Sequence, residues 1–132
     1  MLSDQQFVLQ FETLTLDPAY FNHIGHIRIT WIYLQSLPDT VVQKKVAEGI
    51  KNYATSLGAT DKFHATMTQA FVQLITCRFR QNKELSWGKF LEKNSDLVDD
   101  AKQVIGLHYS DDLLNSRSAQ QQALEPDKRE IK

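Results

Sequence analysis

Apolar residues recur along this chain at intervals of three and four residues, the spacing that places them on one face of an α-helix. No segment alternates apolar and polar residues beside a hairpin signal such as Asn-Gly. Only five glycines and three prolines interrupt the pattern. It therefore predicts an all-α protein, a single compact bundle of four to six helices with a polar C-terminal tail.

Capping signals divide this pattern into segments. Ser3 and Gln6 have the spacing of a capping box, which predicts a first helix over residues 3–15. The second helix is predicted over residues 22–36, with Asn22 as its cap. Both segments are followed by a proline, which limits how far each helix can extend.

Two further long helices follow the second proline-containing turn. The third begins after Pro38 and ends at Gly58, a residue suited to a left-handed C-cap. The fourth is expected to be capped by Thr60 or Asp61 and to run to about Gln81.

The pattern becomes weaker towards the C-terminus. Ser86 can cap a short fifth helix, and one or two brief helices are expected after Asn94. We therefore predict a helical domain over residues 1–115. Residues 116–132 are too polar to bury a sustained face, which favours a surface-hugging or mobile tail.

Composition narrows the possible partners. The chain has 132 residues, 42% of them hydrophobic, which is enough for one domain with a real core. Its net charge of −1 provides no broad attraction for nucleic acid or for an anionic membrane surface. Cys77 is the only cysteine, and no apolar run is long enough to cross a membrane. We expect a cytoplasmic protein, and a homo-oligomer is not excluded.

Histidines inside apolar segments are the most specific feature of the sequence. His23 and His26 lie three residues apart in "FNHIGHIRITWIYL". At about 100° per residue, they share one arc of the second helix with Thr30 and Tyr33. Arg28 points in another direction, where it becomes a candidate for an anionic ligand group.

The fourth helix carries a third histidine, in "KFHATMTQAF". Its periodicity places His64 in the middle of the apolar arc, with Thr68 one turn further on. The same construction places Thr66 and Arg80 on the solvent side, and Arg78 near the helix end, where its charge favours the helix dipole.

If the second and fourth helices pack together, these side chains line a small-ligand or metal pocket between them. Its predicted residues are His23, His26, Arg28, Thr30, Tyr33, His64 and Thr68. Imidazole titrates near neutrality and binds borderline metals, so His23, His26 and His64 can act as acid-base groups or hold a divalent transition metal. Each histidine can instead satisfy a structural hydrogen bond, and both interpretations stay open.

The sequence lacks the motifs that are typical of several reaction classes. The histidine spacing is not the His-Glu-x-x-His of zinc proteases, and no Glu-x-x-His pair supports a di-iron carboxylate bundle. The chain also has no glycine-rich phosphate loop and no Gly-x-Ser-x-Gly elbow. The sequence does not establish any catalytic activity.

The alternative function is a non-enzymatic protein–protein interaction module. Trp87 and Phe90 in the short fifth helix can meet a partner or a second copy, or pack on the protein's own core. His108 with Asp111 and Asp112 can close over a site, or the carboxylates can cap a helix that begins near Leu113.

The segments "FNHIGHIRITWIYL", "KFHATMT", "LHYSDDLL" and "LEPD" give the chain a resemblance to a group of small bacterial helical proteins with no established activity. The resemblance extends over most of the chain. It implies a bacterial source and a single helical domain, and it implies no reaction.

Overall fold

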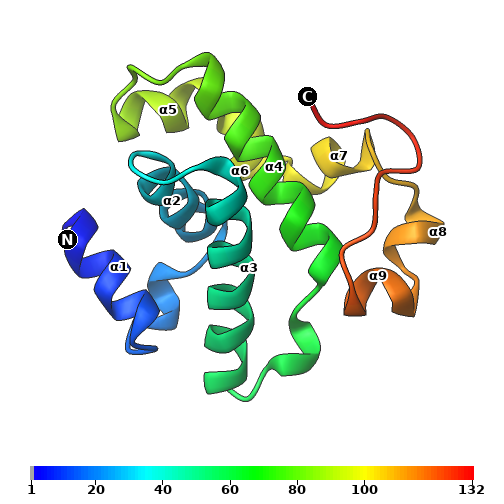
Figure 1. Cartoon of the computed structure of the whole chain (residues 1–132), viewed down its shortest axis with the longest axis horizontal. Coiled ribbons are helices and arrows are strands. Elements are labelled where there is room, and N and C mark those ends of the chain that lie inside the picture. The colour runs from blue at the N-terminus through cyan, green and yellow to red at the C-terminus, as the bar shows by residue number, and fades with distance from the viewer. Residues whose placement is uncertain (1) are drawn as a thin grey trace. The chain divides into compact units, whose positions relative to one another are not determined.

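The computed structural model describes residues 2–132, which contain helices and no strand, so the all-α prediction is confirmed (Figure 1). The chain divides into two compact units, one ending at Phe63 and the other beginning at His64. The prediction of one helical domain over residues 1–115, followed by a polar tail, stays a prediction. No helix in residues 2–132 is both long and apolar enough to span a membrane.

The described residues form nine α-helices, more than the predicted four to six. The first unit contains α1 (Asp4–Glu12), α2 (His23–Leu34) and α3 (Asp39–Ser56). The second contains α4 (Ala65–Gln81), α5 (Trp87–Lys93), α6 (Ser95–Asp99), α7 (Ala101–Gly106), α8 (Asp111–Leu114) and α9 (Arg117–Gln121). The difference arises after Asn94, where polar breaks divide the weakly periodic sequence into four short helices.

The predicted caps of the first unit are confirmed. Ser3 and Gln6 form a complete capping box at α1, and the Asn22 side chain accepts a hydrogen bond from the Gly25 amide at α2. Gly58 follows α3 with a left-handed φ of 71°. The Ser3 and Asn22 caps form because a short polar side chain satisfies backbone N–H groups that have no partner within the helix.

Large apolar side chains from all three helices form the core of the first unit. Phe7 and Phe11 of α1 are buried, as are Val42, Val46, Ile50 and Tyr53 of α3. Helix α2 contacts both neighbours, and residues on most of its sides are buried. Burial of one such side chain contributes about 1.5–3 kcal/mol. Apolar packing therefore holds this unit together.

The start of α4 differs from the sequence prediction. Thr60–Lys62 form a separate 3₁₀ turn, and His64 rather than Thr60 or Asp61 caps α4. Phe63 is extended between the two elements, with φ −70° and ψ 130°, so the 3₁₀ turn cannot continue into the helix. His64 therefore does not lie in the middle of the apolar arc.

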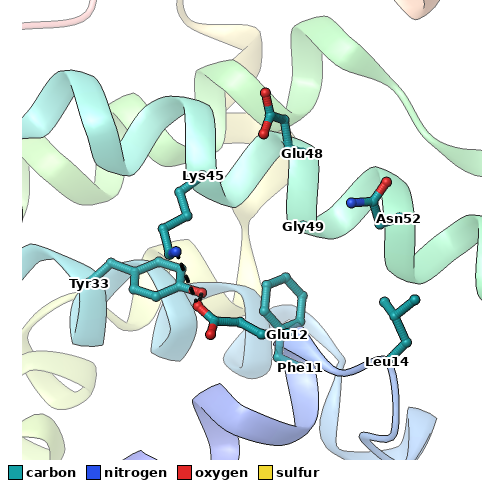
Figure 2. Close-up of a pocket in the computed structure, with 8 residues that line it drawn as sticks. All are labelled: Phe11, Glu12, Leu14, Tyr33, Lys45, Glu48, Gly49 and Asn52. Atoms are coloured by element: carbon teal, nitrogen blue, oxygen red, sulfur yellow. Dashed lines mark hydrogen bonds and ion pairs between the residues drawn. The ribbon is translucent and has the colours of Figure 1, made fainter.

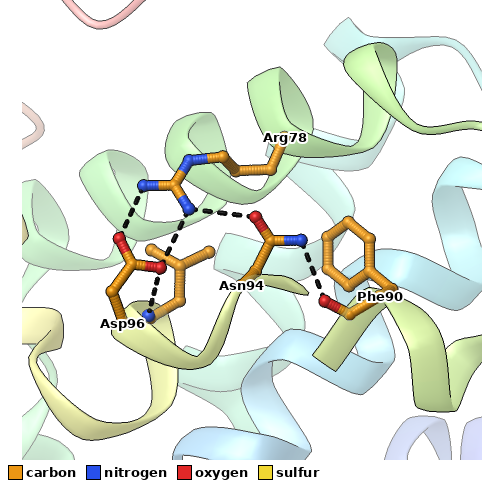
Figure 3. Close-up of polar contacts among 5 residues, drawn as sticks. Arg78, Phe90, Asn94 and Asp96 are labelled. Atoms are coloured by element: carbon orange, nitrogen blue, oxygen red, sulfur yellow. Dashed lines mark hydrogen bonds and ion pairs between the residues drawn. The ribbon is translucent and has the colours of Figure 1, made fainter. Parts of the chain in front are cut away.

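Arg78 joins α4 to the junction of α5 and α6 (Figure 3). Its guanidinium donates to both carboxylate oxygens of Asp96 at 2.9 and 2.8 Å and to Asn94 Oδ1 at 2.9 Å. Asn94 in turn donates to the Phe90 carbonyl at 2.9 Å. The hydrogen bonds from Arg78 hold the pKa of Asp96 below its usual value. Arg78 thus has a specific partner in addition to a favourable position near the helix end.

Two predictions about the short helices can be compared with the structure. Phe90 is fully buried and Trp87 half-buried, which supports the core-packing alternative for Phe90. Helix α8 is capped by Ser110, whose hydroxyl accepts from the Leu113 amide, whereas Asp111 and Asp112 lie in its first turn. The prediction that these carboxylates cap the helix was wrong by one position.

The segment predicted to be a surface-hugging or mobile tail has defined structure. It contains α9, which contacts α4. Its last residues form hydrogen bonds with other residues of the second unit. Thr66, expected on the solvent side of α4, is 0% exposed because this segment covers it. Helical periodicity could not show this contact, since the partner lies 56 residues further along the chain.

Candidate functional site

The two histidines of α2 lie in different surroundings. His23 begins the helix and is exposed, whereas His26 stacks on the Phe21 ring with centroids 4.3 Å apart. His26 Nδ1 lies 2.8 Å from the Asn22 carbonyl, which fixes the Nδ1–H tautomer. Burial lowers the pKa of His26, so its neutral form is favoured.

Arg28 and Thr30 serve local structure in the first unit. Thr30 is buried and donates to the His26 carbonyl at 2.9 Å. Arg28 donates to the Leu2 carbonyl at 2.7 Å and to Asp4 Oδ1 at 3.1 Å. These contacts tie α2 to the start of α1, and they occupy Nη2 of Arg28, the residue predicted as a candidate for an anionic ligand group.

Both ring nitrogens of His64 have partners in the second unit. Nδ1 accepts from the Met67 amide at 3.1 Å, and Nε2 lies 2.8 Å from the Leu114 carbonyl. A metal ion at either nitrogen would therefore replace an existing hydrogen bond. Thr68 is half-buried one turn further along α4.

No group of three or more metal-ligating side chains occurs in the described part of the chain. His23 and His26 belong to the first unit, whereas His64 belongs to the second. Their convergence with Arg28, Thr30, Tyr33 and Thr68 on a ligand or on a divalent transition metal remains a prediction.

A surface concavity of about 250 Å³ lies within the first unit, where the end of α1 meets α2 and α3 (Figure 2). We call it the α1–α3 concavity. Its lining residues are Phe11, Glu12, Leu14, Tyr33, Lys45, Glu48, Gly49 and Asn52. Tyr33 is the one member of this set that the sequence marked as a candidate site residue.

A charged network occupies one end of the concavity (Figure 2). Tyr33 donates to Glu12 Oε2 at 2.6 Å, and Lys45 Nζ lies 3.3 Å from the same oxygen. Lys45 also lies over the Tyr33 ring, 5.3 Å from its centroid. Burial, followed by the hydrogen bond to the Glu12 carboxylate, raises the pKa of Tyr33, so its hydroxyl remains a donor at neutral pH.

The floor of the concavity depends on a glycine. A Cβ atom at Gly49 would lie 2.5 Å from the Phe11 ring, so α3 approaches α1 closely only with glycine at this position. The Phe11 ring stacks on Phe21 with centroids 5.1 Å apart, which fixes its position from the other side. The floor is therefore apolar and tightly packed.

Leu14 lies at the edge of the concavity in an unusual conformation (Figure 2). Its φ is 64°, and it follows α1 at the position where glycine is usual, while the Thr15 amide bonds back to the Gln10 carbonyl. The left-handed conformation costs about 1–2 kcal/mol for a residue with a Cβ. Leu14 is nevertheless 43% exposed, so burial of its side chain offsets only part of this cost.

Two polar side chains of α3 complete the edge. Glu48 and Asn52 lie one helical turn apart and both are exposed. Within residues 2–132, neither side chain has a hydrogen bond or ion pair to another residue. They can therefore accept hydrogen bonds from a bound group without breaking a contact of the protein.

One sequence signal for this site lies on α3, outside the set of predicted site residues. Lys45, Glu48 and Asn52 recur at three and four residues, a polar stripe on one face of the helix. Such a stripe is ordinary for a solvated helix, so it does not by itself indicate a site. The contribution of Glu12 and Leu14 depends on where α1 ends, which periodicity defines poorly.

Comparisons with models of protein families, with curated proteins and with solved structures find no match to this chain.

Proposed function

We propose that the first unit is a non-enzymatic interaction module, and that the α1–α3 concavity receives one basic side chain of a partner polypeptide. The observation that carries this proposal is Leu14, a large apolar side chain held exposed beside the concavity in a conformation that glycine would adopt more easily. Backbone strain of this kind tends to persist at sites where the displayed side chain has a function.

The charges of the lining residues favour a cationic group. Glu12 and Glu48 contribute two negative charges and Lys45 one positive charge, which leaves −1. Lys45 is paired with Glu12, so the carboxylate available to a ligand is Glu48. Asn52 adds a carbonyl acceptor beside it, while Leu14 can cover the aliphatic stem of an arginine or lysine.

The size of the site favours a side chain over a free small molecule. Pockets for small ligands usually measure about 300–1,000 Å³ and bury most of the ligand. The α1–α3 concavity measures about 250 Å³ and lies at the surface, so it can surround one side chain of a longer chain. Tyr33 stays protonated and Glu12 already accepts two contacts, so these groups favour binding rather than proton transfer.

NMR titration of the chain with N-acetyl-leucyl-arginine amide tests this proposal. We expect saturable shifts of the Gly49 backbone amide and the Asn52 side-chain amide, with weak affinity. N-acetyl-leucyl-glutamine amide should leave both signals unchanged. Glu48→Gln should weaken binding of the arginine peptide about two- to fivefold, which is the effect of losing one exposed ion pair.

Glu84→Gln is the matched control, because Glu84 is an exposed glutamate in the second unit. It should leave the titration unchanged. Equal shifts with both peptides, or an equal effect of the two substitutions, would contradict the proposal. If agmatine binds as tightly as the arginine peptide, the site recognises a free small amine instead of a polypeptide.

A further inference from the structure

The last eleven residues, 122–132, follow α9 as an extended segment that we call the strap. None of its residues is buried. Leu124, Pro126 and Ile131 are half-buried and provide its main apolar contacts. The strap therefore contributes little to the apolar core of the second unit.

Side chains of the second unit hold the first half of the strap by its backbone. Thr66 Oγ1 donates to the Gln122 carbonyl at 2.9 Å and accepts from the Leu124 amide at 3.0 Å. The Tyr109 hydroxyl donates to the Leu124 carbonyl at 3.0 Å. One threonine and one tyrosine thus satisfy three backbone groups of the strap, as a peptide-binding groove does.

The second half of the strap is held both by its backbone and by its own polar side chains. The Lys128 amide donates to the His108 carbonyl at 3.0 Å, and His108 Nδ1 lies 2.7 Å from the Arg129 carbonyl. Asp127 accepts from the Ser110 amide at 2.8 Å and from its hydroxyl at 2.5 Å. Asp127 and Ser110 therefore fix the register of the strap.

The groove and the strap differ in burial. Thr66 is 0% exposed and Tyr109 1% exposed, and their hydroxyls bond to the strap. Departure of the strap would leave both hydroxyls without these partners, which is unfavourable for buried polar groups. The strap itself would lose few apolar contacts. The groove consequently favours an occupant, while its present occupant is held by hydrogen bonds, including those of the Asp127 and Lys128 side chains, and buries little apolar surface.

We propose that the groove also accepts the strap of a second copy of this chain, so that two copies can exchange residues 122–132. A second copy supplies the same backbone groups and the same Asp127, so each groove regains every hydrogen bond it loses. Residues 122 and 123, between α9 and Leu124, the first half-buried strap residue, are exposed and can change direction.

Disulfide trapping between two full-length variants tests the exchange. Both carry Cys77→Ser, one also carries Ser110→Cys, and the other also carries Asp127→Cys. After incubation of the mixture at high concentration and oxidation with glutathione disulfide, we expect a covalent heterodimer linked between positions 110 and 127. A single chain with both substitutions should form the bond internally and shows that the two positions can be linked.

The control mixture combines Ser110→Cys with Lys44→Cys, an exposed position on α3 of the first unit. The heterodimer yield should be several times higher for the first mixture than for this one. Equal yields would overturn the proposal. If the doubly substituted chain forms no internal bond, size exclusion of the unmodified chain decides: a dimer that persists after dilution supports exchange, and a monomer at all concentrations refutes it.

Discussion

The first unit packs three helices of nine, twelve and eighteen residues through large apolar side chains, whereas the second surrounds the seventeen-residue α4 with five helices of four to seven residues. Helices shorter than about 12 residues are marginal on their own. The short helices are held by hydrogen bonds between distant residues, such as His64 to Leu114 and Arg78 to Asp96. The first unit therefore depends mainly on apolar burial, whereas the short helices of the second combine buried apolar residues such as Phe90 and Leu97 with polar contacts between distant residues.

The largest expected effect is therefore on the apolar core of the first unit. Phe11→Ala should lower the free energy of unfolding by about 3–5 kcal/mol, because it leaves a cavity between Phe21, Tyr53 and Gly49. Leu9→Ala on the same helix is the control, since Leu9 is 61% exposed. Chemical denaturation measures both, and a loss below about 1 kcal/mol for Phe11→Ala would contradict the comparison.

In the second unit, the removal of one hydroxyl should lower the free energy of unfolding although the side-chain volume hardly changes. Thr66→Val should cost about 1–3 kcal/mol, because Thr66 is buried and the Gln122 and Leu124 backbone groups lose their partner. Thr68→Val, two residues further along α4, is the matched control because Thr68 is only half-buried. Equal melting temperatures for the two variants would show that the hydrogen bonds of Thr66 to the strap contribute nothing to stability.

Leu14→Gly should have a smaller effect on stability than these two substitutions, and it should stabilise the protein instead of destabilising it. Glycine adopts the left-handed conformation without a Cβ clash, so the variant should gain about 0.5–1 kcal/mol in unfolding free energy. It should also lose affinity for the arginine peptide. Leu57→Gly is the control, since Leu57 is exposed with a negative φ and should lose stability. Destabilisation by both substitutions would remove the argument from strain at Leu14.

The smallest expected effect is a pH dependence that arises in the first unit. Burial lowers the pKa of His26 below its ordinary value of 6.5, so the unfolded chain binds a proton more readily than the folded one. Stability should therefore decrease as the pH falls below about 6.5, and His26→Gln should weaken this dependence. Thermal melts between about pH 5 and 8 measure it. The same slope in the variant would show that another group is responsible.

The all-α fold and the caps of α1, α2 and α5 could be predicted because their causes are local. Ser3 meets Gln6, Asn22 meets Gly25 and Ser86 meets Lys89, each three residues apart. The backbone geometry of a helix start depends on these few residues alone, so the sequence pattern carries the information.

The candidate site and the strap depended on contacts that no local pattern encodes. Glu12 meets Tyr33 across 21 residues, and Thr66 meets Gln122 across 56. Helical periodicity assigns each side chain to a face of its own helix, but it does not say what covers that face. Thr66 was therefore placed on the solvent side, and the polar C-terminal segment was expected to be a surface-hugging or mobile tail. The sequence by itself determined the all-α fold and the caps of α1, α2 and α5. Tertiary packing decided the partners of the buried polar side chains, because a buried hydroxyl gains a partner only where a distant backbone approaches it.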